Sequence, residues 1–260
     1  MTIRYEGKVA IVTGAGNGLG KAHALALAER GAKVVVNDLG GARDGTGGSI
    51  SAAEEVANHI NASGGEAIAN GANVTKDDDV LEMVQAAVEK WGRVDILINN
   101  AGIFKSPINK TKDGLDIRFA VNYFAPFMLT NALLPLLKNG TDARIINLSS
   151  AAQSTVRIGA LNGEADVNVS EAYAQSKLAL TMWSFDLAKR LEKASVIAVN
   201  PGSLLNTRMA NEAYGQHWSP ATKGSDILYE LAVSDEYNGI TGKYFSTVSP
   251  KTKSSTRSES

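Results

Sequence analysis

The chain has 260 residues, of which 44% are hydrophobic and 20% charged, with a formal net charge of −1. This composition is typical of a globular protein with one or two α/β domains, and the small net charge argues against nucleic acid and acidic membranes as partners. Because there are no cysteines, disulfides, thiol catalysis and cysteine-bound metals are excluded. The polar N-terminus and the lack of an uninterrupted apolar run of membrane-spanning length favour a cytoplasmic protein with no membrane partner.

The first predicted unit is a strand, a glycine-rich turn, a helix and a second strand. Val9–Val12 is a short apolar run, and the octamer TGAGNGLG leads directly into the helical pattern Lys21–Arg30. A second apolar run, Lys33–Val36, ends at Asn37-Asp38. Glycines let a phosphate approach the backbone, and the helix N-terminus offers free amide protons to a pyrophosphate. The unit therefore predicts a dinucleotide site, with contacts from Gly14, Asn17, Gly18, Leu19 and Gly20.

The acidic residue after the second strand predicts which dinucleotide is preferred. Asp38 follows Gly20 at about the 20-residue spacing at which such a carboxylate meets the adenosine ribose. A carboxylate accepts hydrogen bonds from two ribose hydroxyls and repels a 2′-phosphate, so Asp38 favours NAD over NADP. Arg43, in the loop that follows, is the basic residue that could instead reach a 2′-phosphate.

Strands and helices alternate through the rest of the chain. Strands are predicted at Glu66–Ala69, Val94–Ile98, Ala143–Leu148, Val196–Val199 and Gly242–Phe245. Helices are predicted at Ile50–Ile60, Asp77–Trp91, Leu115–Leu137, from about Ser170 to Leu191, and at Gly224–Ser234. The alternation predicts an α/β fold with a doubly wound parallel sheet, in a single Rossmann-type domain over residues 1–245 with a polar tail over 246–260.

Tyr173 and Lys177 are the candidate chemical pair. Positions four apart share a helix face, so the phenol and the ammonium can point at one place. A tyrosine has a pKa near 10, and a nearby cation lowers that pKa by stabilising the phenolate. The pair could then exchange a proton with an alcohol or a ketone. Taken alone, such a pair is more often a surface feature than a catalytic one.

Several motifs in order carry a family resemblance. TGAGNGLG is followed by Asn99-Asn100-Ala101-Gly102, by Asn122, Ser150, Tyr173 and Lys177, and by Asn200-Pro201-Gly202. Over about Lys8 to Phe245 the chain resembles the compact, one-domain short-chain dehydrogenases/reductases. The segment Val34–Gly41 resembles the hydroxyacyl-CoA dehydrogenase part of multifunctional β-oxidation enzymes, whereas Ser150–Lys177 resembles retinol-dehydrogenase-type members.

The resemblance implies a role for each catalytic candidate. Tyr173 is the acid/base, Lys177 lowers its pKa and binds the nicotinamide ribose, and Ser150 donates to the substrate oxygen. Asn122 holds a water that links Lys177 to solvent. Further cofactor contacts are implied at Asn73, Val74, Asn100, Ala101, Gly102, Pro201, Gly202 and Thr207, besides Tyr173 and Lys177.

The chain also departs from the resembled pattern. Ser150 and Tyr173 are 23 positions apart, a longer gap than in most compact members, and the extra segment Ser154–Val169 is expected to lie over the substrate pocket. After Gly202 the threonine comes one position late, because Asn206 stands where the family usually places it.

The reaction implied is reversible hydride transfer between the nicotinamide and a secondary alcohol or ketone. The alternatives are a catalytically inactive NADH sensor of the same fold and a nucleotide-sugar epimerase or dehydratase. Apolar residues in Ser154–Val169 and Leu204–Pro220 predict an apolar substrate, with steroid, retinoid, acyl-CoA and small alcohols all left open. A homotetramer or homodimer built from the helices Leu115–Leu137 and Glu171–Leu191 is implied. The three histidines do not form a metal-binding set, so no metal is expected, and His23 and His59 are predicted to be exposed.

Overall fold

The computed structural model describes residues 5–40, 50–137, 142–202, 227–228, 230–232 and 234–246. Several predictions fall outside these ranges. They concern Arg43, Thr207, the whole loop Leu204–Pro220 with the pair His217-Trp218, and the tail after Ser246.

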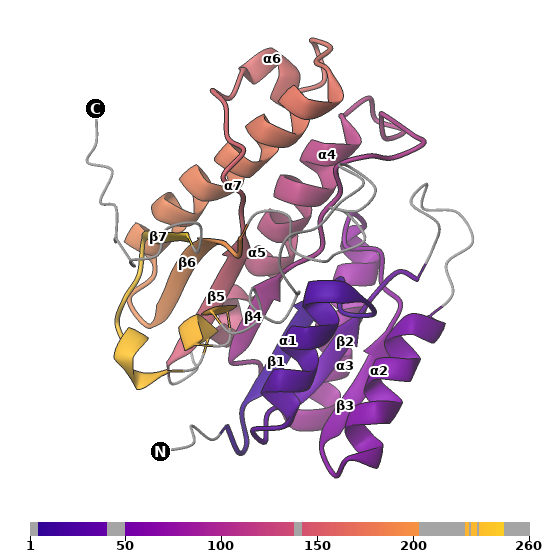
Figure 1. Cartoon of the computed structure of the whole chain (residues 1–260), viewed down its shortest axis with the longest axis vertical. Helices are drawn as coiled ribbons and strands as arrows, with labels where there is room; N and C mark the ends of the chain where they lie inside the picture. The colour runs from indigo at the N-terminus through magenta and orange to yellow at the C-terminus, as the bar shows by residue number, and fades with distance from the viewer. Residues whose placement is uncertain are drawn as a thin grey trace.

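The described strands form one parallel sheet (Figure 1). They are β1 (Val9–Thr13), β2 (Lys33–Asn37), β3 (Glu66–Asn70), β4 (Ile96–Asn99), β5 (Ala143–Leu148), β6 (Ala194–Asn200) and β7 (Lys243–Ser246). Their order across the sheet is β3-β2-β1-β4-β5-β6-β7, so the chain winds outward in both directions from the β1–β4 pair. This confirms the predicted doubly wound α/β fold. Ser246, the first residue of the predicted tail, is the last residue of β7 and accepts a hydrogen bond from Asn200 at 3.0 Å.

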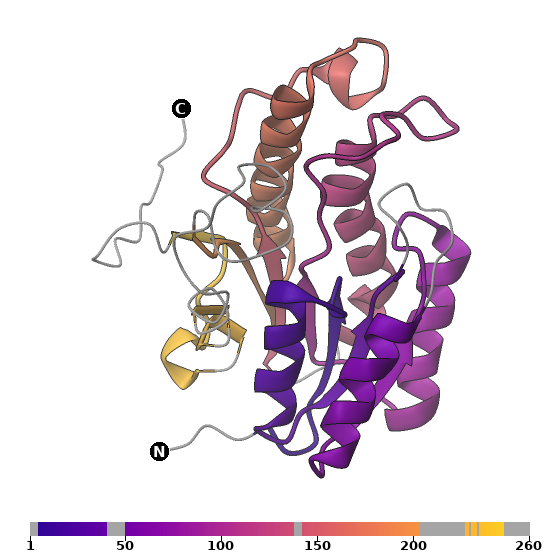
Figure 2. The same cartoon turned by 45° about the vertical axis from the view of Figure 1, so that its right-hand side comes forward.

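Helices cover both faces of the sheet (Figure 2). They are α1 (Gly18–Ala28), α2 (Ser51–Ala62), α3 (Asp77–Trp91), α4 (Ile117–Phe119), α5 (Ala125–Leu137), α6 (Ile158–Leu161) and α7 (Val169–Arg190). One apolar core joins the sheet to α1 and α2, and the other joins it to α3, α5 and α7. The strands are short apolar runs because they are buried on both faces by these two layers.

The predicted helix Leu115–Leu137 is interrupted at its centre. α4 passes into α5 through a π-helical turn, η1 (Ala120–Phe124), which contains the buried Asn122. Pro126 lies four residues after Asn122 and has no N–H to donate to the Asn122 carbonyl, so the regular α-helical hydrogen bond cannot form there. The chain is helical from Ile117 to Leu137, which confirms the predicted helical stretch, and the missing proline N–H explains the change of helical period within it.

α7 begins one residue before the predicted start. Its N-cap is Asn168, whose Oδ1 accepts a hydrogen bond from the Glu171 N–H at 2.9 Å. This bond satisfies one of the free amide protons of the first turn. From this start the helix runs past the carboxyl end of β5, which brings Tyr173 and Lys177 to the edge of the sheet (Figure 1).

Candidate active site

Lys177 is buried where α7 crosses the end of β5. Its side chain donates a hydrogen bond of 2.7 Å from Nζ to the carbonyl of Leu148, the last residue of the strand. The residue is only 4% exposed, and burial lowers the pKa of the amine to about 8. A buried amine in this pKa range can exchange its proton near neutral pH, which an exposed lysine does not do.

Tyr173 lies beside this lysine, as the four-residue spacing predicts. The Lys177 Nζ is 5.8 Å from the centroid of the Tyr173 ring. The ring also packs against Phe104 in a T-shaped contact, with centroids 5.1 Å apart and planes at 84°. Phe104 was not predicted as part of the site, although it follows closely after the Asn99–Gly102 motif in the sequence. The aromatic contact limits the directions in which the tyrosine ring can move.

Asn122 ties the segment after β4 to α7. Its Oδ1 accepts from the Ile103 N–H at 2.8 Å, while its Nδ2 donates to the Ile103 carbonyl at 3.0 Å and to Ser176 Oγ at 3.0 Å. A Cβ on Gly102 would lie 3.3 Å from Asn122 Oδ1 and 3.4 Å from Lys177 Nζ, so a larger residue would crowd both groups. The side chain of Asn122 therefore has a structural role, and the water expected at this residue remains a prediction.

Ser150 follows β5 in a tight turn. Its Oγ accepts a hydrogen bond of 3.1 Å from the Ala152 N–H. Its carbonyl accepts two more, from Tyr244 OH at 2.9 Å and from Gln153 Nε2 at 3.0 Å. Within the described residues the Ser150 hydroxyl donates to no protein group. Its proton is therefore available to a bound molecule.

The glycine turn packs closely against the chain after β4. Asn100 Nδ2 donates to the carbonyls of Thr13 at 2.7 Å and Gly14 at 3.0 Å. A Cβ on Gly20 would lie 2.2 Å from the Gly14 carbonyl oxygen and 2.4 Å from Asn100 Nδ2, so only glycine fits there. Within the same turn, Asn17 is the exposed N-cap of α1, and Leu19 is almost fully buried.

Asp38 holds the same turn from the end of β2. Its Oδ2 accepts from the Gly16 N–H at 2.8 Å, and its Oδ1 accepts from the Gly40 N–H at 2.9 Å. The carboxylate is thus fixed directly beside the glycine turn, as the sequence spacing predicts. It remains partly exposed and so can meet a ligand.

The other cofactor candidates in the described range gather along the same edge of the sheet. Asn73 follows β3 and accepts hydrogen bonds at Oδ1 from the backbone and side chain of Thr75, and Val74 beside it is half-buried. Ala101 donates its N–H to Thr13 Oγ1 at 3.0 Å. Pro201 and Gly202 directly follow β6. In a doubly wound sheet, the crevice at the carboxyl ends of the strands is where ligands bind, so the predicted residues converge on the expected place.

The histidine prediction was half wrong. His59 is exposed as expected, but His23 is 1% exposed and lies on the buried face of α1. Neither of its ring nitrogens has a hydrogen-bond partner in the part of the chain that the structure describes, and burial lowers the pKa of the imidazole to about 3. The sequence did not show which side of α1 is buried, because the helix carries small and apolar residues on nearly every side and has no distinct polar face. Among the described residues, no group of three His, Asp or Glu side chains could hold a metal ion.

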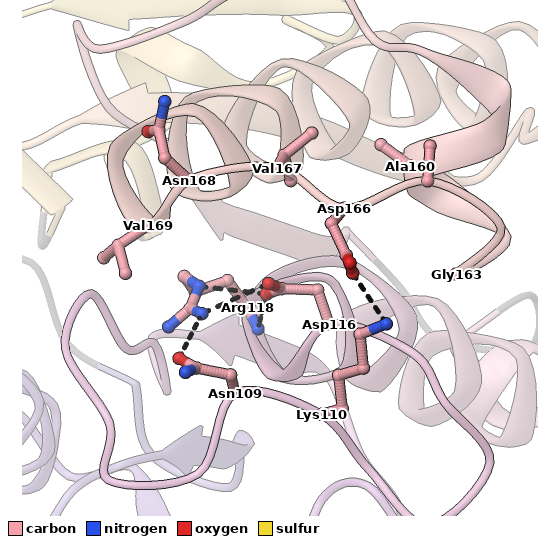
Figure 3. Close-up of a pocket in the computed structure, with 11 residues that line it drawn as sticks. Asn109, Lys110, Asp116, Arg118, Ala160, Gly163, Asp166, Val167, Asn168 and Val169 are labelled. Atoms are coloured by element: carbon pink, nitrogen blue, oxygen red, sulfur yellow. Dashed lines mark hydrogen bonds and ion pairs between the residues drawn. The ribbon is translucent and has the colours of Figure 1, made fainter.

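The extra segment before Tyr173 is attached to α7. The Arg157 N–H donates to Gln175 Oε1 at 2.9 Å, and the Arg157 guanidinium forms an ion pair of 2.9 Å with Glu171. Together with residues 109–118 the segment lines an open pocket of 380 Å³ (Figure 3). Inside it Arg118 binds Asp116, while Lys110 and Asp166 form an ion pair of 2.7 Å between the two walls. The segment thus forms a wall beside the N-terminal turns of α7.

One described helical stretch, Ile117–Leu137, has the length and hydropathy of a membrane span. In this fold the stretch packs against β5, α3 and α7, so it acts as a core helix covering the sheet. The absence of a membrane partner remains a prediction.

Comparisons with known proteins agree with this geometry. Residues 8–217 match the family model of the short chain dehydrogenases. Human retinol dehydrogenase 14 is 33% identical over 92% of this chain and 78% of its own length. The peroxisomal hydratase-dehydrogenase-epimerase of Neurospora crassa is 38% identical over 75% of this chain, which is 21% of that longer protein.

Solved structures of short chain dehydrogenases and reductases are also similar to this fold. A short chain dehydrogenase from Burkholderia cenocepacia in complex with NADP superposes with a TM-score of 0.76 at 30% identity, covering 94% of this chain and 98% of the other. A 3-ketoacyl-(acyl-carrier-protein) reductase from Brucella melitensis complexed with NADH has a TM-score of 0.74 at 30% identity, covering 94% and 97%. With the family match spanning most of the chain, these similarities show that the protein belongs to the short-chain dehydrogenase family of nicotinamide-dependent oxidoreductases.

Proposed function

We propose that this protein is an NAD(H)-dependent oxidoreductase that interconverts a secondary alcohol and the corresponding ketone, or a related carbonyl. The observation that supports this best is the buried Lys177 amine, held by the Leu148 carbonyl and 5.8 Å from the centre of the Tyr173 ring. Burying a charged amine costs folding free energy. A cation held beside a phenol lowers the pKa of that phenol, which favours proton transfer to and from it. When bound, the nicotinamide ring supplies or accepts the hydride.

Tyr173 handles the proton in this proposal. In the reductive direction its phenol gives a proton to the carbonyl oxygen, and in the oxidative direction its phenolate takes a proton from the alcohol. The Lys177 ammonium stabilises the phenolate by Coulomb attraction, which is strong in a buried site. Ser150 donates its hydroxyl proton to the same substrate oxygen and stabilises the negative charge that develops there. Asn122 completes the proposed set, with its predicted water connecting Lys177 to solvent.

The residues at the carboxyl edge of the sheet support a bound dinucleotide. Because Gly20 has no side chain, the Gly14–Gly20 turn can pack closely against the chain after β4. The N-terminus of α1, which follows directly, can bind a pyrophosphate through its free amide protons. The Asp38 carboxylate, fixed by two backbone N–H groups, supports NAD over NADP because it would repel a 2′-phosphate. Further contacts are proposed for Asn73, Val74, Asn100, Ala101, Gly102, Pro201, Gly202 and Thr207.

The substrate is proposed to be an apolar alcohol or carbonyl compound. The similarity to a retinol dehydrogenase and to a ketoacyl reductase supports this class, and the Phe104 ring next to Tyr173 is apolar. We also propose a homodimer or homotetramer in a reducing compartment such as the cytoplasm. Phe127 and Met182 support the assembly, because they expose 38% and 56% of their surface on α5 and α7, the helices expected to meet.

The test combines cofactor binding with turnover. Calorimetric titration with NADH and NADPH should show tighter binding of NADH, and absorbance at 340 nm should report turnover of an apolar ketone or alcohol. Tyr173→Phe should lower kcat by about 10²–10⁴-fold and leave the Kd for NADH nearly unchanged, because only the proton donor is lost. The matched control is Tyr237→Phe, which removes a hydroxyl from a tyrosine that packs on Phe245.

Three outcomes would count against the proposal. Retained activity in Tyr173→Phe would contradict the acid/base role. Tight NADH binding without turnover of any tested alcohol or carbonyl would favour an NADH sensor. If neither nucleotide binds, the assignment of the glycine turn as the cofactor site is wrong.

A further inference from the structure

We propose that Gln153 and Tyr244 are positioning residues that fix the catalytic candidate Ser150 relative to α7. The inference rests on the proposed function, because it assigns these two side chains a role in the same reaction. Both side chains donate a hydrogen bond to the same atom, the carbonyl oxygen of Ser150.

The Ser150 carbonyl is held from two separate elements. Tyr244, in β7, donates from its hydroxyl at 2.9 Å, and Gln153, three residues after Ser150, donates from Nε2 at 3.0 Å. A carbonyl oxygen has two lone pairs, so these two donors satisfy it fully. The peptide group between Ser150 and Ala151 therefore cannot rotate without breaking both bonds.

Gln153 also connects this turn to α7. Its Nε2 lies 3.2 Å from Ser149 Oγ and 3.3 Å from Thr181 Oγ1. These two hydroxyls are 2.7 Å apart, and they lie 3.1 Å and 2.9 Å from the Lys177 carbonyl oxygen. A continuous set of hydrogen bonds thus runs from the Ser150 carbonyl to the backbone of Lys177.

The direction of the Ser150 hydroxyl depends on this set. Its Oγ accepts from the Ala152 N–H at 3.1 Å, within the same turn, so the orientation of the turn determines where the remaining O–H points. Accepting one hydrogen bond also polarises a hydroxyl and makes it a better donor. For Ser150 to serve the same substrate oxygen as Tyr173, the turn and α7 must keep a fixed separation, which the Gln153 contacts provide.

The distribution of these residues in the sequence explains why no motif reveals them. Tyr244 is 94 positions from Ser150, and it reaches the site only because β7 pairs with β6 at the end of the sheet. β7 also carries Ser246, which accepts a hydrogen bond from Asn200, so the strand is fixed at its carboxyl end. Tyr244 therefore reaches Ser150 from a rigid position.

The experiment is a double-mutant cycle on turnover. Tyr244→Phe and Gln153→Met each remove the donor and keep most of the side-chain volume. In the otherwise unchanged protein each should lower kcat by about 10-fold, with little change in NADH affinity, because a misdirected Ser150 weakens the chemical step and not cofactor binding. In the Ser150→Ala background the same substitutions should have almost no further effect, because the hydroxyl that they position is already absent. Tyr237→Phe, with the same loss of a phenol hydroxyl, should leave kcat unchanged in both backgrounds.

A crystal structure of each single variant with NADH provides a second readout that does not depend on turnover. We expect the Ser150 turn to shift or to become disordered while Tyr173 and Lys177 stay in place. Effects on kcat that persist unchanged in Ser150→Ala would overturn the proposal, since they would act through something other than Ser150. An unmoved Ser150 in both variant structures would overturn it as well. If the unmodified enzyme binds NADH but turns over no substrate, the proposed function fails, and the crystal structures alone then decide whether these residues hold Ser150.

Discussion

The Lys177 amine and the Leu148 carbonyl are joined by a buried hydrogen bond of 2.7 Å, which connects α7 to the carboxyl end of β5. This bond brings the lysine into a site where burial lowers the pKa of its amine from 10.5 to about 8. Below pH 8 the Lys177 amine is protonated in the folded protein, although it binds this proton less strongly there than in the unfolded chain. Part of the folding free energy is given up to keep this lysine in the site.

Replacing Lys177 by methionine should stabilise the protein at neutral pH. Below pH 8 the folded and unfolded lysine both carry the proton, and the burial cost, about 3 kcal/mol for a pKa shift of this size, is fully present. Between pH 8 and 10.5 the folded lysine releases its proton before the unfolded one, so the stability of the unmodified protein rises toward that of the variant. Because the Leu148 carbonyl loses its donor in the variant, the net gain at pH 7 should be about 2 kcal/mol.

The measurement is urea unfolding of Lys177→Met and the unmodified protein from pH 7 to 10.5. The two stability curves should converge as the pH rises. Curves that stay parallel over this range would show that the lysine is not buried at a cost. The variant should also lose most of its turnover, so stability and activity would change in opposite directions.

His23→Leu should make the protein more resistant to acid. Above pH 6.5 the imidazole is neutral in both the folded and the unfolded protein, so the full stability is present. As the pH falls from 6.5 to about 3, the unfolded histidine takes up a proton that the buried one does not, and stability falls. At pH 5 this loss amounts to about 2 kcal/mol, and the leucine variant should not show it.

Unfolding of His23→Leu at pH 8 and pH 5 checks this prediction against His59→Leu as the control. His59 is exposed on α2, so its replacement by leucine provides the matched control for a histidine on the surface. The same decline between pH 8 and pH 5 in all three proteins would mean that another group governs acid unfolding.

Gly20→Ala should damage both folding and cofactor binding. The added methyl would lie 2.2 Å from the Gly14 carbonyl oxygen and 2.4 Å from Asn100 Nδ2, so α1 would have to move away from both the glycine turn and the chain after β4. Such overpacking should cost about 3 kcal/mol of stability. Gly18→Ala, in the same turn, is the comparison, because a Cβ there meets nothing within 4 Å and only the backbone angle of φ 55° is strained. That change should cost about 1 kcal/mol, as measured by thermal unfolding without ligand. Equal losses in the two variants would show that the close packing at Gly20 is not what requires a glycine.

Replacing Asp38 by asparagine tests whether the negative charge of this side chain, as distinct from its shape, determines the preference for NADH over NADPH. The amide keeps one oxygen as an acceptor for a backbone N–H, but the negative charge beside the glycine turn is lost. We expect the Kd for NADPH to fall by about 10-fold or more, which corresponds to about 1.4 kcal/mol, while the Kd for NADH changes less. Calorimetric titration of both nucleotides measures this. A preference for NADPH in the unmodified protein would contradict the role given to Asp38.

Elements defined by local patterns were predicted well from the sequence. The strand, turn and helix around TGAGNGLG, the alternation that gives the sheet, and the Tyr173–Lys177 pair all rest on residues near one another in the chain. The convergence of Asp38, Asn100 and Ser150 on one edge also followed, because parallel strands end on the same side of a sheet.

Features that depend on distant contacts were missed. Tyr244 lies in a short strand with no marked pattern, and its bond to Ser150 spans 94 positions. Phe104 meets Tyr173 only after β4 and α7 are brought together by the sheet. His23 was placed on the wrong side of its helix because its neighbours are small and apolar all round. In each case the deciding contact comes from tertiary packing, which local sequence does not encode.

The π-helical turn at Ala120–Phe124 accommodates one residue more than an α-helix of the same rise. The helical turns on either side of it therefore keep their buried faces, and Arg118 and Phe119 stay in the core. A one-residue deletion inside the turn should leave these faces in place, but it would move the Asn122 side chain away from Ile103 and Ser176, the groups to which it is bonded. The extra residue thus serves the contacts of Asn122, whereas the burial of the helix does not depend on it.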